Sequence, residues 1–378
     1  MRKLTGILLS LALVSAFAVP AHAEPGVSAK SAILMHADSG RVLYEKNADE
    51  HMLIASTTKI MTALVVLEHC ALDELVEVDE RSAGIEGSSM YLKAGESYTV
   101  EDLLYGLMLA SGNDAASALA LHVADSLEDF AALMNEKAAA LGMTESSFKN
   151  PHGLDEEGHY STARDMAKLA ACCMENPDFA RIAGAVSHTV GEQTYVNHNR
   201  LLREYDGCLG LKTGYTMAAG RTLVTCAERD GARYVCVTLN DPDDWDDHKA
   251  LYDWAFANYS FAEVIPAGLN FDVPVISGEE MLAGAETEGA AYALVKNGES
   301  YTTQFELPSF VFAPIAEGES AGRAVACADG QEIASVRLVY STDVELAREL
   351  RLTPGERFMR FWLLTGCGAP FYLEQERE

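Results

Sequence analysis

A serine and a lysine three residues apart form the first candidate for chemistry in this chain. Ser56 and Lys59 lie in the segment 54–62, which reads Ile-Ala-Ser-Thr-Thr-Lys-Ile-Met-Thr. At the start of a helix, residues with this spacing share one face. A serine hydroxyl is a weak nucleophile until a base removes its proton, and a neutral lysine serves as that base. Burial, a helix N-terminus and a second nearby cation all lower a lysine pKa. A catalytic Ser56–Lys59 pair therefore predicts that another lysine, from elsewhere in the chain, lies close to Lys59.

Two further motifs follow the first in the chain. Residues 111–113 read Ser-Gly-Asn at the end of a helical pattern, where a helix break can turn a hydroxyl and an amide into a cleft. Residues 212–214 read Lys-Thr-Gly just before the strand pattern at 221–227, and this lysine supplies the second cation. Each triplet alone is typical of an ordinary loop or turn. Together, in this order, the motifs predict a nucleophilic serine site.

Hairpins and helices that must position these motifs alternate through residues 31–259. Two β-prone runs flank a turn at 38–40, and two more flank Asp230-Gly231. Between the hairpins apolar residues recur with the period of a helix, and Thr99 with Asp102 resembles a capping box. A hairpin on each side of a helical block predicts one antiparallel sheet with helices packed against it. We expect helices at 56–69, from Thr99 onward, and at 114–125, 128–141, 162–174 and 244–259.

The last third of the chain has a different pattern. From residue 263 to 343 short strand-like runs alternate with Gly, Glu and Asn turns, which predicts a separate small β-sandwich-like domain. The segment 344–378 carries Phe358, Phe361 and Trp362 among arginines, a mixture that suits a membrane interface. We therefore expect this tail to form an amphipathic helix that anchors the protein to a membrane surface. A helix packed on the β-domain is the alternative.

The first residues have the pattern of an export signal. Arg2 and Lys3 precede the apolar run 7–14, and residues 21–23, Ala-His-Ala, suit signal peptidase. Ser10, Ser15 and Pro20 interrupt the run, which makes a membrane-spanning anchor less suitable. Residues 1–23 are predicted to be a signal peptide, and the mature protein is expected to be exported and to work outside the cytoplasmic membrane.

Composition excludes one class of partner. The 378 residues include 28 Lys and Arg against 57 Asp and Glu, a net charge of −29. Nucleic-acid binding depends on Lys and Arg that displace counterions from phosphates, so DNA and RNA are not expected as partners.

Cysteine and histidine spacing gives no sign of a metal centre. The eight cysteines permit disulfides in an exported chain, but they lack the paired spacing of a zinc site. We expect mostly buried free thiols. His152 and His159 flank an acidic segment at 155–157, and loop structure is favoured there over a metal site. No metal and no other cofactor is expected.

The order SxxK, SxN and KTG resembles the signature of penicillin-binding proteins and serine β-lactamases. Within that superfamily the chain is similar to the low-molecular-mass serine D-alanyl-D-alanine carboxypeptidases. The similarity is strong over about 30–260 and weaker to the end, and it implies an α+β catalytic domain over 24–262, with a helical subdomain, followed by a small all-β domain. The segments that carry it are IASTTKIMTALVVLEH, LMLASGNDAASALA, NPHGLDEEGHYSTARDMAKLA and GLKTGYTMAAGRTLV.

The resemblance also implies a reaction and a substrate. In such enzymes a serine attacks the peptide bond between the two terminal D-alanines of a peptidoglycan stem peptide and releases D-alanine. Water then hydrolyses the acyl-enzyme. Penicillins acylate the same serine, because their strained lactam mimics the D-alanyl-D-alanine bond.

Roles for individual residues follow from the same resemblance. Ser56 is expected to be the nucleophile, Lys59 its general base and Ser111 a proton relay. Asn113 is expected to hold the substrate's amide carbonyl. Substrate binding is further expected from Lys212, Thr213, Gly214, Tyr215 and Arg200.

These last residues meet different parts of the substrate. Lys212 and Thr213 suit its C-terminal carboxylate, to which Arg200 adds affinity, and Gly214 lets its backbone approach closely. The backbone N–H groups of Ser56 and Tyr215 are expected to form the oxyanion hole. Relatives commonly have histidine where this chain has Tyr215.

Other functions remain open at the level of sequence. A class A β-lactamase would need a glutamate in an E-x-x-L-N stretch, which is absent between Asn113 and Lys212, so slow acylation by penicillin is expected instead of efficient hydrolysis. A D,D-endopeptidase would use the same groups. A Ser-His-Asp hydrolase would favour a G-x-S-x-G turn between a strand and a helix, and the one match, residues 318–322, lies in the strand-like C-terminal region with no helical pattern after it. A cell-wall binding or β-lactam-sensing protein without turnover is the non-enzymatic alternative.

Overall fold

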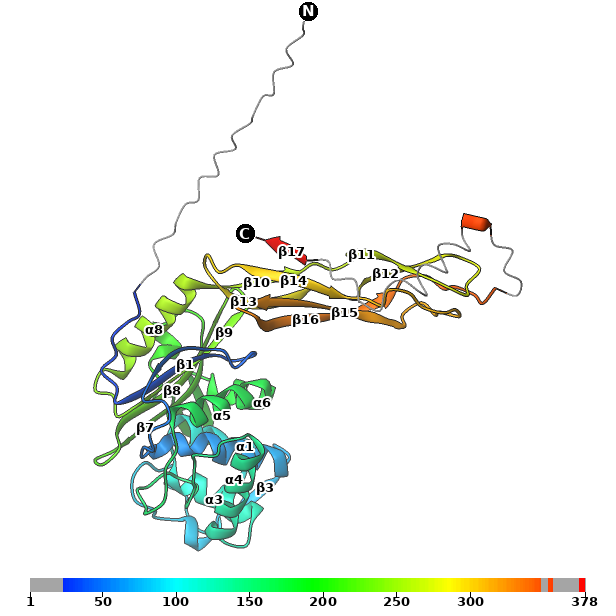
Figure 1. The fold of residues 1–378 in the computed structure, drawn as a ribbon. Helices are drawn as coiled ribbons and strands as arrows, with labels where there is room; N and C mark the ends of the chain where they lie inside the picture. Colours follow the sequence, from blue (N-terminus) through cyan, green and yellow to red (C-terminus); the bar gives the residue numbers. More distant parts are fainter. Residues whose placement is uncertain (1–22, 348–352, 356–373, 378) are drawn as a thin grey trace, which may run out of the picture. The chain divides into compact units, whose positions relative to one another are not determined.

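The computed structural model describes residues 23–347, 353–355 and 374–377. One compact unit spans Ala23–Phe261, and a second begins at Ala262 (Figure 1). The predicted signal peptide lies outside the described residues except for Ala23.

A single antiparallel sheet forms the centre of the first unit. Its strand order is β2-β1-β9-β8-β7, so the N-terminal hairpin pairs with strands from the end of the unit. Asp230 and Gly231 both have positive φ in the β8–β9 turn, as a tight two-residue hairpin requires. The predicted sheet built from both ends is confirmed. Its strands are β1 (Ser31–His36), β2 (Val42–Lys46), β7 (Cys208–Thr216), β8 (Gly220–Arg229) and β9 (Ala232–Leu239).

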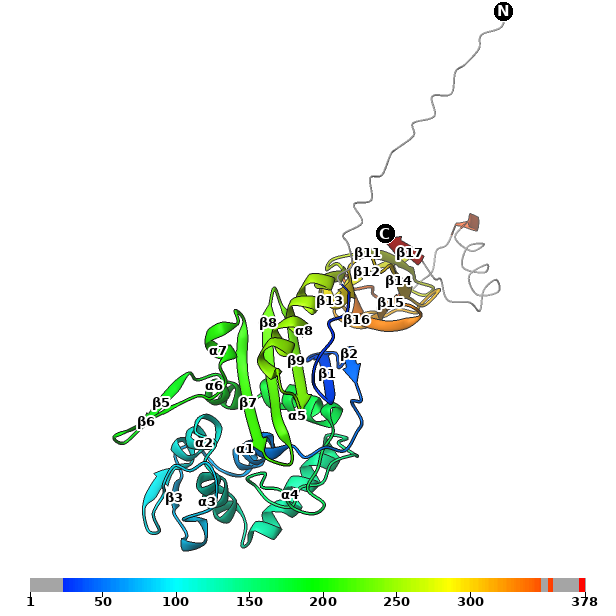
Figure 2. The same cartoon turned by 90° about the vertical axis from the view of Figure 1, so that its left-hand side faces the viewer.

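Helices cover both faces of this sheet (Figure 2). On one face Val235 and Val237 belong to the main hydrophobic core, which includes residues of α5. On the other face Thr225 and Thr238 hydrogen-bond to His248 of α8 at 2.7 and 3.1 Å. Burial on both faces explains why β9 is apolar almost throughout and does not alternate.

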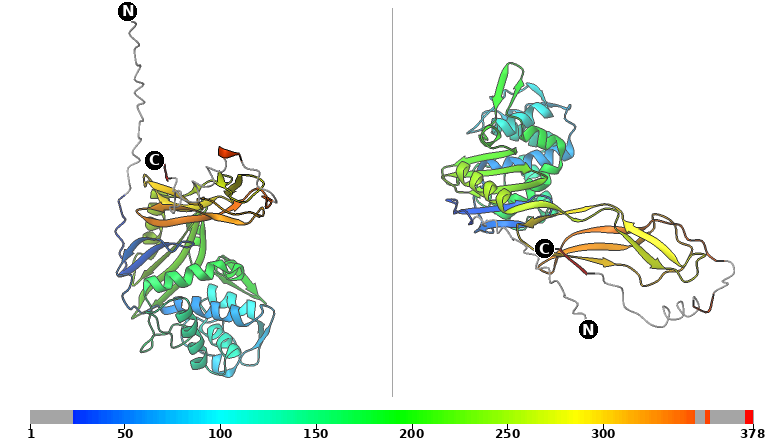
Figure 3. Two further views of the ribbon diagram at one scale, coloured as in Figure 1. Left: turned by 45° about the vertical axis from the view of Figure 1, so that its right-hand side comes forward. Right: turned by 90° about the horizontal axis from the view of Figure 1, so that it is seen from above.

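Most of the predicted helices are present. The helices of the first 150 residues, coloured blue to cyan, lie on the same side of the sheet as α5 (Figure 3). The predicted cap is confirmed, because the Thr99 hydroxyl accepts a hydrogen bond from the Asp102 amide at 3.1 Å. The patterns did not predict α6 or α7, which are short. The helices are α1 (Lys59–His69), α2 (Val100–Leu109), α3 (Asn113–Val123), α4 (Leu127–Ala140), α5 (Ala163–Glu175), α6 (Pro177–Ala183), α7 (Leu201–Glu204) and α8 (Asp244–Asn258).

Short elements complete the first unit. Two small hairpins and two 3-10 turns connect the helices, and they carry little periodicity from which they could be predicted. They are η1 (Ala55–Thr58), β3 (Leu75–Glu77), η2 (Glu80–Ser82), β4 (Ser97–Thr99), β5 (Ser187–Val190) and β6 (Gln193–Val196).

The Lys-Thr-Gly motif lies inside a strand. The sequence pattern placed it just before the strand at 221–227, but residues 212–214 form the middle of β7 and pair with β8. The strand sequence Cys-Leu-Gly-Leu-Lys-Thr-Gly-Tyr-Thr contains two glycines and no clear alternation, so it did not resemble a strand.

The second unit is all-β, as predicted. Its larger sheet has the order β11-β12-β16-β15-β14-β17, and β10 pairs with β13. Val264, Phe305 and Leu338 are among its buried core residues. The strands are β10 (Tyr259–Ile265), β11 (Asn270–Pro274), β12 (Leu282–Thr287), β13 (Ala291–Lys296), β14 (Tyr301–Glu306), β15 (Ser320–Ala328), β16 (Gln331–Tyr340) and β17 (Glu374–Arg377).

The two ends of the predicted tail are extended and belong to this β unit. Val344 and Leu346 form isolated bridges with Ile315 and Gly278, and Glu374–Arg377 pairs with β14. An amphipathic helix over the whole of 344–378 is therefore wrong, because backbone pairing holds both ends in the extended conformation. Phe358, Phe361 and Trp362 lie outside the described residues.

All cysteines in the described part of the chain are free thiols. Cys173, Cys226 and Cys236 are buried, and Cys70, Cys172, Cys208 and Cys327 are half-buried. Within the same residues, no helix is both long enough and apolar enough to cross a membrane.

Candidate active site

A cavity of about 510 Å³ in the first unit brings the three sequence motifs together. Ser56, Ser111 and Thr213 line it, although they come from segments far apart in the chain. Lys59, Asn113 and Lys212 are buried beside it. The lining residues are Ser56, Ser88, Ser111, His198, Thr213, Gly214, Tyr215, Arg221, Asp244 and Trp245.

Ser56 sits in a 3-10 turn that is tied to the sheet. The Ile54 carbonyl accepts hydrogen bonds from the Thr57 hydroxyl at 2.6 Å and from the Thr222 hydroxyl of β8 at 3.1 Å. Ala55 has φ +47°, an uncommon conformation for a residue with a side chain. The strained turn presents Ser56 to the cavity while its neighbours Thr57 and Thr58 are buried.

Gly214 allows β7 to pass close to this turn. A Cβ at Gly214 would lie 2.4 Å from the Thr222 hydroxyl and 3.0 Å from the Ser56 nitrogen. Any larger residue would therefore push the strand and the Ser56 turn apart. The glycine was expected to let a substrate backbone approach, but the close contact lies within the protein itself.

Lys59 is completely buried and its amine meets three oxygens. Nζ lies 3.0 Å from Ser56 Oγ, 2.7 Å from Asn113 Oδ1 and 2.6 Å from the His152 carbonyl. The Asn113 and His152 oxygens can only accept hydrogen bonds, whereas Ser56 can also donate one. In its neutral form the amine has two N–H groups for the two carbonyl oxygens, which leaves its lone pair for the Ser56 proton.

Electrostatics favour the neutral form of Lys59. Burial and the nearby charge of Lys212 hold the Lys59 pKa well below its usual range, and Asp114 opposes that shift. The predicted second cation is therefore present and acts in the predicted direction.

The Ser-Gly-Asn segment lies in the break between α2 and α3. Ser111 has φ +60°, which ends α2 and places this residue on the cavity wall. Asn113 begins α3, and its side-chain amide also donates to the Glu86 carbonyl at 2.5 Å. Its amide is therefore engaged on both sides, by Lys59 and by Glu86.

Asp114 secures the neighbouring loop. Its buried carboxylate accepts hydrogen bonds from the backbone amides of Met90 and Leu92 at 2.9 and 3.0 Å, and from the Ser89 hydroxyl at 2.6 Å. This places Ser88, the residue before, on the wall of the cavity.

Lys212 is the second buried lysine. It is 1% exposed, its Nζ donates to the Thr213 carbonyl at 2.9 Å, and burial lowers its pKa to about 7. Side chains two residues apart lie on the same face of a strand, so Lys212 shares a face with Gly214, whose free side meets the Ser56 turn. Because the Lys212 pKa is about 7, a small change in the surroundings of this amine changes its charge at neutral pH.

A loop to which the sequence patterns assigned no role supports helix α1. The His152 carbonyl accepts from Lys59, and the Pro151 carbonyl accepts from the Thr62 hydroxyl at 2.6 Å. A Cβ at Gly153 would lie 2.0 Å from the Ala55 carbonyl oxygen, so only glycine fits. His159 hydrogen-bonds to Thr58 at 2.8 Å. Burial lowers the pKa values of both histidines to about 4, and they act as neutral packing groups of this loop.

The cavity wall also contains residues that the sequence motifs did not single out. Arg221 pairs with the buried carboxylate of Asp244 at 2.6 Å, and its guanidinium lies 5.7 Å from the centre of the Trp245 ring. His198 is also on the cavity wall, and burial together with Lys212 lowers its pKa.

Arg200 does not line the cavity. Its side chain is 53% exposed and pairs with Glu204 at 2.9 Å one helical turn away, and its guanidinium carbon lies 5.7 Å from the centre of the Trp245 ring. The pairing i, i+4 satisfies the guanidinium locally, so the expected contribution to carboxylate binding does not follow from the structure. Arg221 lines the cavity instead. The sequence could have pointed to it, because Arg221 is a basic residue on the strand that pairs with the Lys-Thr-Gly strand.

Comparison with known proteins places this geometry in a family. Residues 18–243 match the family model described as D-alanyl-D-alanine carboxypeptidase, and these residues contain the whole serine–lysine centre. The chain belongs to the D-alanyl-D-alanine carboxypeptidase family. Residues 262–346 of this carboxypeptidase match a second model, described as the C-terminal domain of penicillin-binding protein 5, in agreement with its all-β second unit.

Individual relatives cover nearly the whole carboxypeptidase. It is 34% identical over 366 residues to the D-alanyl-D-alanine carboxypeptidase DacF of Bacillus subtilis, which covers 91% of this chain and 94% of that protein. DacA of Haemophilus influenzae is 31% identical over 368 residues, 89% of this chain and 92% of that protein. The crystal structure of penicillin-binding protein 5 from Haemophilus influenzae superposes with a TM-score of 0.72 at 30% identity, covering 86% of this chain and 99% of that one.

The predicted family, fold class and enzyme type are therefore confirmed. The chain is a serine-type D-alanyl-D-alanine carboxypeptidase of the cell wall, with an α+β catalytic unit and an all-β unit after it.

Proposed function

We propose that the cavity hydrolyses the bond between the two terminal D-alanines of peptidoglycan stem peptides through an acyl-enzyme on Ser56. One observation carries the proposal: Lys59 Nζ lies 3.0 Å from Ser56 Oγ while carbonyl oxygens occupy its other hydrogen-bonding directions. The lysine is thereby arranged to take the serine proton and nothing else.

In the acylation step Ser56 Oγ gives its proton to Lys59 and bonds to the carbonyl carbon of the penultimate D-alanine. The backbone N–H groups of Ser56 and Tyr215 face the developing oxyanion in this mechanism. The C–N bond breaks as the leaving nitrogen receives the proton, relayed from Lys59 through Ser111, and D-alanine departs. The 65% exposed Tyr215 side chain is not needed, because its contribution is a backbone one.

Substrate binding in this proposal uses the strand β7. Thr213 lies on the cavity wall and Lys212 directly behind it, so a carboxylate beside Thr213 receives a hydrogen bond and a positive charge. The negative substrate group restores the proton on Lys212, whose pKa of about 7 makes that charge responsive to its surroundings. Asn113 Oδ1 orients Lys59 and one of the two amide N–H groups donates to the Glu86 carbonyl, so we assign the second N–H to the substrate's amide carbonyl.

Deacylation reverses the proton path. Lys59 takes a proton from water as the water oxygen bonds to the acyl carbon, and it then returns that proton to Ser56 Oγ as the ester C–O bond breaks and the shortened peptide leaves as a carboxylic acid. Among the described residues that line the cavity, Asp244 is the only acidic one, and Arg221 already pairs with it. The described cavity wall therefore has no free carboxylate that could activate water as the glutamate of a class A β-lactamase does. For this reason we propose that penicillin acylates Ser56 and that the acyl-enzyme is hydrolysed slowly.

Release of D-alanine from diacetyl-Lys-D-Ala-D-Ala is the deciding measurement. We expect release by the native chain and none by Ser56→Ala, with fluorescent penicillin labelling the native chain alone. Labelling without release would leave a β-lactam-sensing or cell-wall binding protein. A native chain with neither property would refute both proposals. Cross-linked muropeptides in the same assay test for D,D-endopeptidase cleavage.

The carboxypeptidase is a cell-wall enzyme that acts outside the cytoplasm. We propose further that residues 1–23 are removed as a signal peptide and that the tail holds the enzyme on the outer face of the cytoplasmic membrane. The arginines and aromatic residues at 357–362 support this placement.

Truncation tests the membrane proposal. A chain ending at Ala347 keeps the pairing of Val344 and Leu346 with the β unit and should lose sedimentation with anionic vesicles while keeping D-alanine release. The matched full-length variant Phe361→Ser, Trp362→Ser should lose sedimentation as well, because it removes the apolar groups alone. Unchanged sedimentation of both would contradict the anchor.

A further inference from the structure

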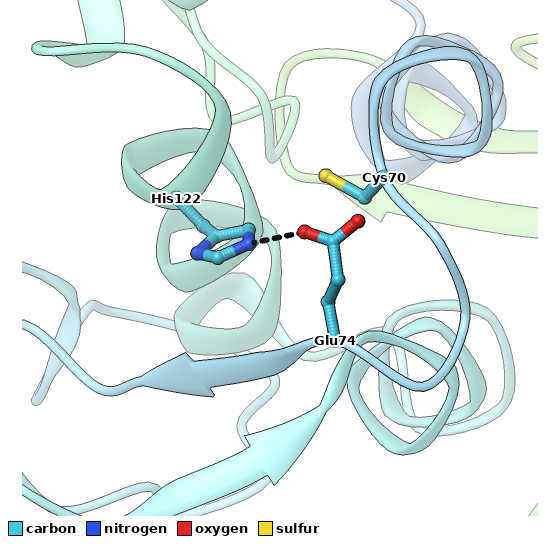
Figure 4. Close-up of side chains that lie close together, drawn as sticks. All are labelled: Cys70, Glu74 and His122. Atoms are coloured by element: carbon cyan, nitrogen blue, oxygen red, sulfur yellow. Dashed lines mark hydrogen bonds and ion pairs between the residues drawn. The ribbon is translucent and has the colours of Figure 1, made fainter.

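Three metal-ligating side chains of different types converge far from the cavity. The Cys70 sulfur, a Glu74 carboxylate oxygen and a His122 ring nitrogen all lie within 4.8 Å of one another. Figure 4 shows the Cys70 thiol and the His122 imidazole both next to the Glu74 carboxylate, and His122 Nε2 lies 3.4 Å from Glu74 Oε2. None of these residues belongs to the catalytic arrangement.

The backbone holds each of the three in place. Cys70 follows the last residue of α1, and its N–H donates to the Val66 carbonyl at 2.9 Å. Glu74 is fixed twice, by the Val100 amide on its carbonyl at 2.9 Å and by the Ala71 amide on Oε1 at 2.5 Å. His122 lies in the last turn of α3. The ligands thus come from well-packed segments, so little ordering is needed when an ion binds.

Thiolate, imidazole and carboxylate together select the kind of ion. Hard cations such as Ca²⁺ and Mg²⁺ prefer oxygen ligands only, whereas Zn²⁺ accepts sulfur, nitrogen and oxygen in one tetrahedral site. Three protein ligands leave a fourth position for water. The half-buried thiol and the exposed Glu74 and His122 leave a path for the ion from solvent.

We propose that Cys70, Glu74 and His122 bind a zinc ion that ties together the C-terminal ends of α1 and α3. The thiol releases its proton to solvent as the Zn–S bond forms, and no redox step is involved. Lys59 begins α1 and Asn113 begins α3, so the ion joins the two catalytic helices at their opposite ends. Helices of 11 residues place it about 16 Å from the catalytic residues, and its role is structural.

The spacing of the three ligands along the chain explains why the sequence did not predict this site. Cys70 and Glu74 are four residues apart, and His122 follows 48 residues after Glu74, a spacing that matches no zinc motif. The expectation of no metal rested on such motifs alone.

Titration of the metal-free full chain with Zn²⁺, in competition with a chromophoric chelator, tests the proposal. We expect one zinc ion per chain, and Co²⁺ in its place should show a thiolate-to-cobalt charge-transfer band. Cys70→Ser and His122→Gln should each weaken binding by at least about 100-fold, and only Cys70→Ser should abolish the band. Cys172→Ser removes another half-buried thiol, and His51→Gln removes a histidine that faces Glu145 at 2.8 Å without a cysteine. Both controls should bind like the native chain.

Thermal unfolding gives an independent measurement. Zinc at 100 times its Kd should raise the Tm of the native chain by about 5 °C and leave the Tm of His122→Gln unchanged. D-alanine release should stay within about twofold with and without zinc, because the ion does not touch the cavity. Should Cys70→Ser fail to fold, Glu74→Gln replaces it. Failure to bind zinc stoichiometrically, or equal binding by native chain and ligand variants, would overturn the site without affecting the proposed reaction.

Discussion

At the scale of single residues, the proposed catalytic centre contains two lysines that are removed from water. Lys59 is 0% exposed and Lys212 1% exposed in a protein whose other charges lie mostly at the surface. A buried ammonium is costly, and the protein lowers this cost by favouring the neutral amine. For Lys59 the neutral form is also the form that can accept the serine proton.

Replacement of this base by a group that keeps its proton should abolish turnover. In Lys59→Arg the guanidinium stays charged, so we expect the rate of D-alanine release to fall by about 10³-fold or more. Lys30→Arg is the matched control, because Lys30 pairs with Glu50 at the surface, and it should leave the rate unchanged. Near-normal turnover by Lys59→Arg, with circular dichroism showing a folded chain, would exclude Lys59 as the general base.

The two lysines should give opposite limbs of the pH profile. Activity rises with pH as Lys59 loses its proton, because its pKa is lowered in the folded protein. Carboxylate binding needs Lys212 protonated, so kcat/KM should fall as pH passes the Lys212 pKa of about 7. Bound substrate raises that pKa, and the falling limb of kcat should therefore lie at higher pH than that of kcat/KM. Coincident profiles for kcat and kcat/KM would show that Lys212 does not bind the carboxylate.

At the scale of elements, the site is built where helices begin or end in strained backbone conformations and where the strand β7 passes close to the Ser56 turn. Ala55 before the nucleophile and Ser111 after α2 both have positive φ, and such conformations persist where surrounding contacts hold them. Here those contacts include the Thr222 hydroxyl on the Ile54 carbonyl. The strand β7 completes the arrangement through Gly214.

A methyl group at Gly214 should damage catalysis more than stability. Gly214→Ala would force the Thr222 hydroxyl and the Ser56 backbone away from β7, and misplacement of about 1 Å can cost about 10²-fold in rate. We expect a loss of about that size in kcat/KM, measured by D-alanine release, with the Tm only slightly lower. Gly26→Ala, whose Cβ meets nothing within 4 Å, should be neutral. Full activity of Gly214→Ala would mean that the strand and the turn move independently.

At the scale of the whole molecule, an acidic protein must capture an acidic substrate. The net charge is −29, and near the cavity Arg221 is already paired with Asp244. Lys212 is thus the main local attraction for a carboxylate, while the surrounding surface repels it.

Salt should therefore accelerate substrate capture. Between about 20 and 200 mM salt we expect kcat/KM to rise by about twofold, because screening weakens the long-range repulsion more than the buried contact. The value of kcat should change little. A marked fall in kcat/KM with salt would show that attraction, not repulsion, governs the approach of the substrate.

Local sequence signals predicted much of the fold and the Ser56–Lys59 part of the site. Helix periodicity and the Thr99 cap act between residues three or four apart, and hairpin turns act within two, so these patterns are readable along the chain. For the same reason the Ser56–Lys59 pair can be recognised in the sequence alone, since both residues stand at one helix start.

By itself the sequence determined the longer helices, the two hairpins of the main sheet, the identity of the three motifs and, through the order of the motifs, the family. Only the tertiary structure decided that the His152 carbonyl and Asn113 orient Lys59, that Arg221 and not Arg200 reaches the cavity, and that Cys70 and His122 meet. These contacts join residues many positions apart, and packing decides them, because no periodic pattern along a chain records which distant side chains will share the same space.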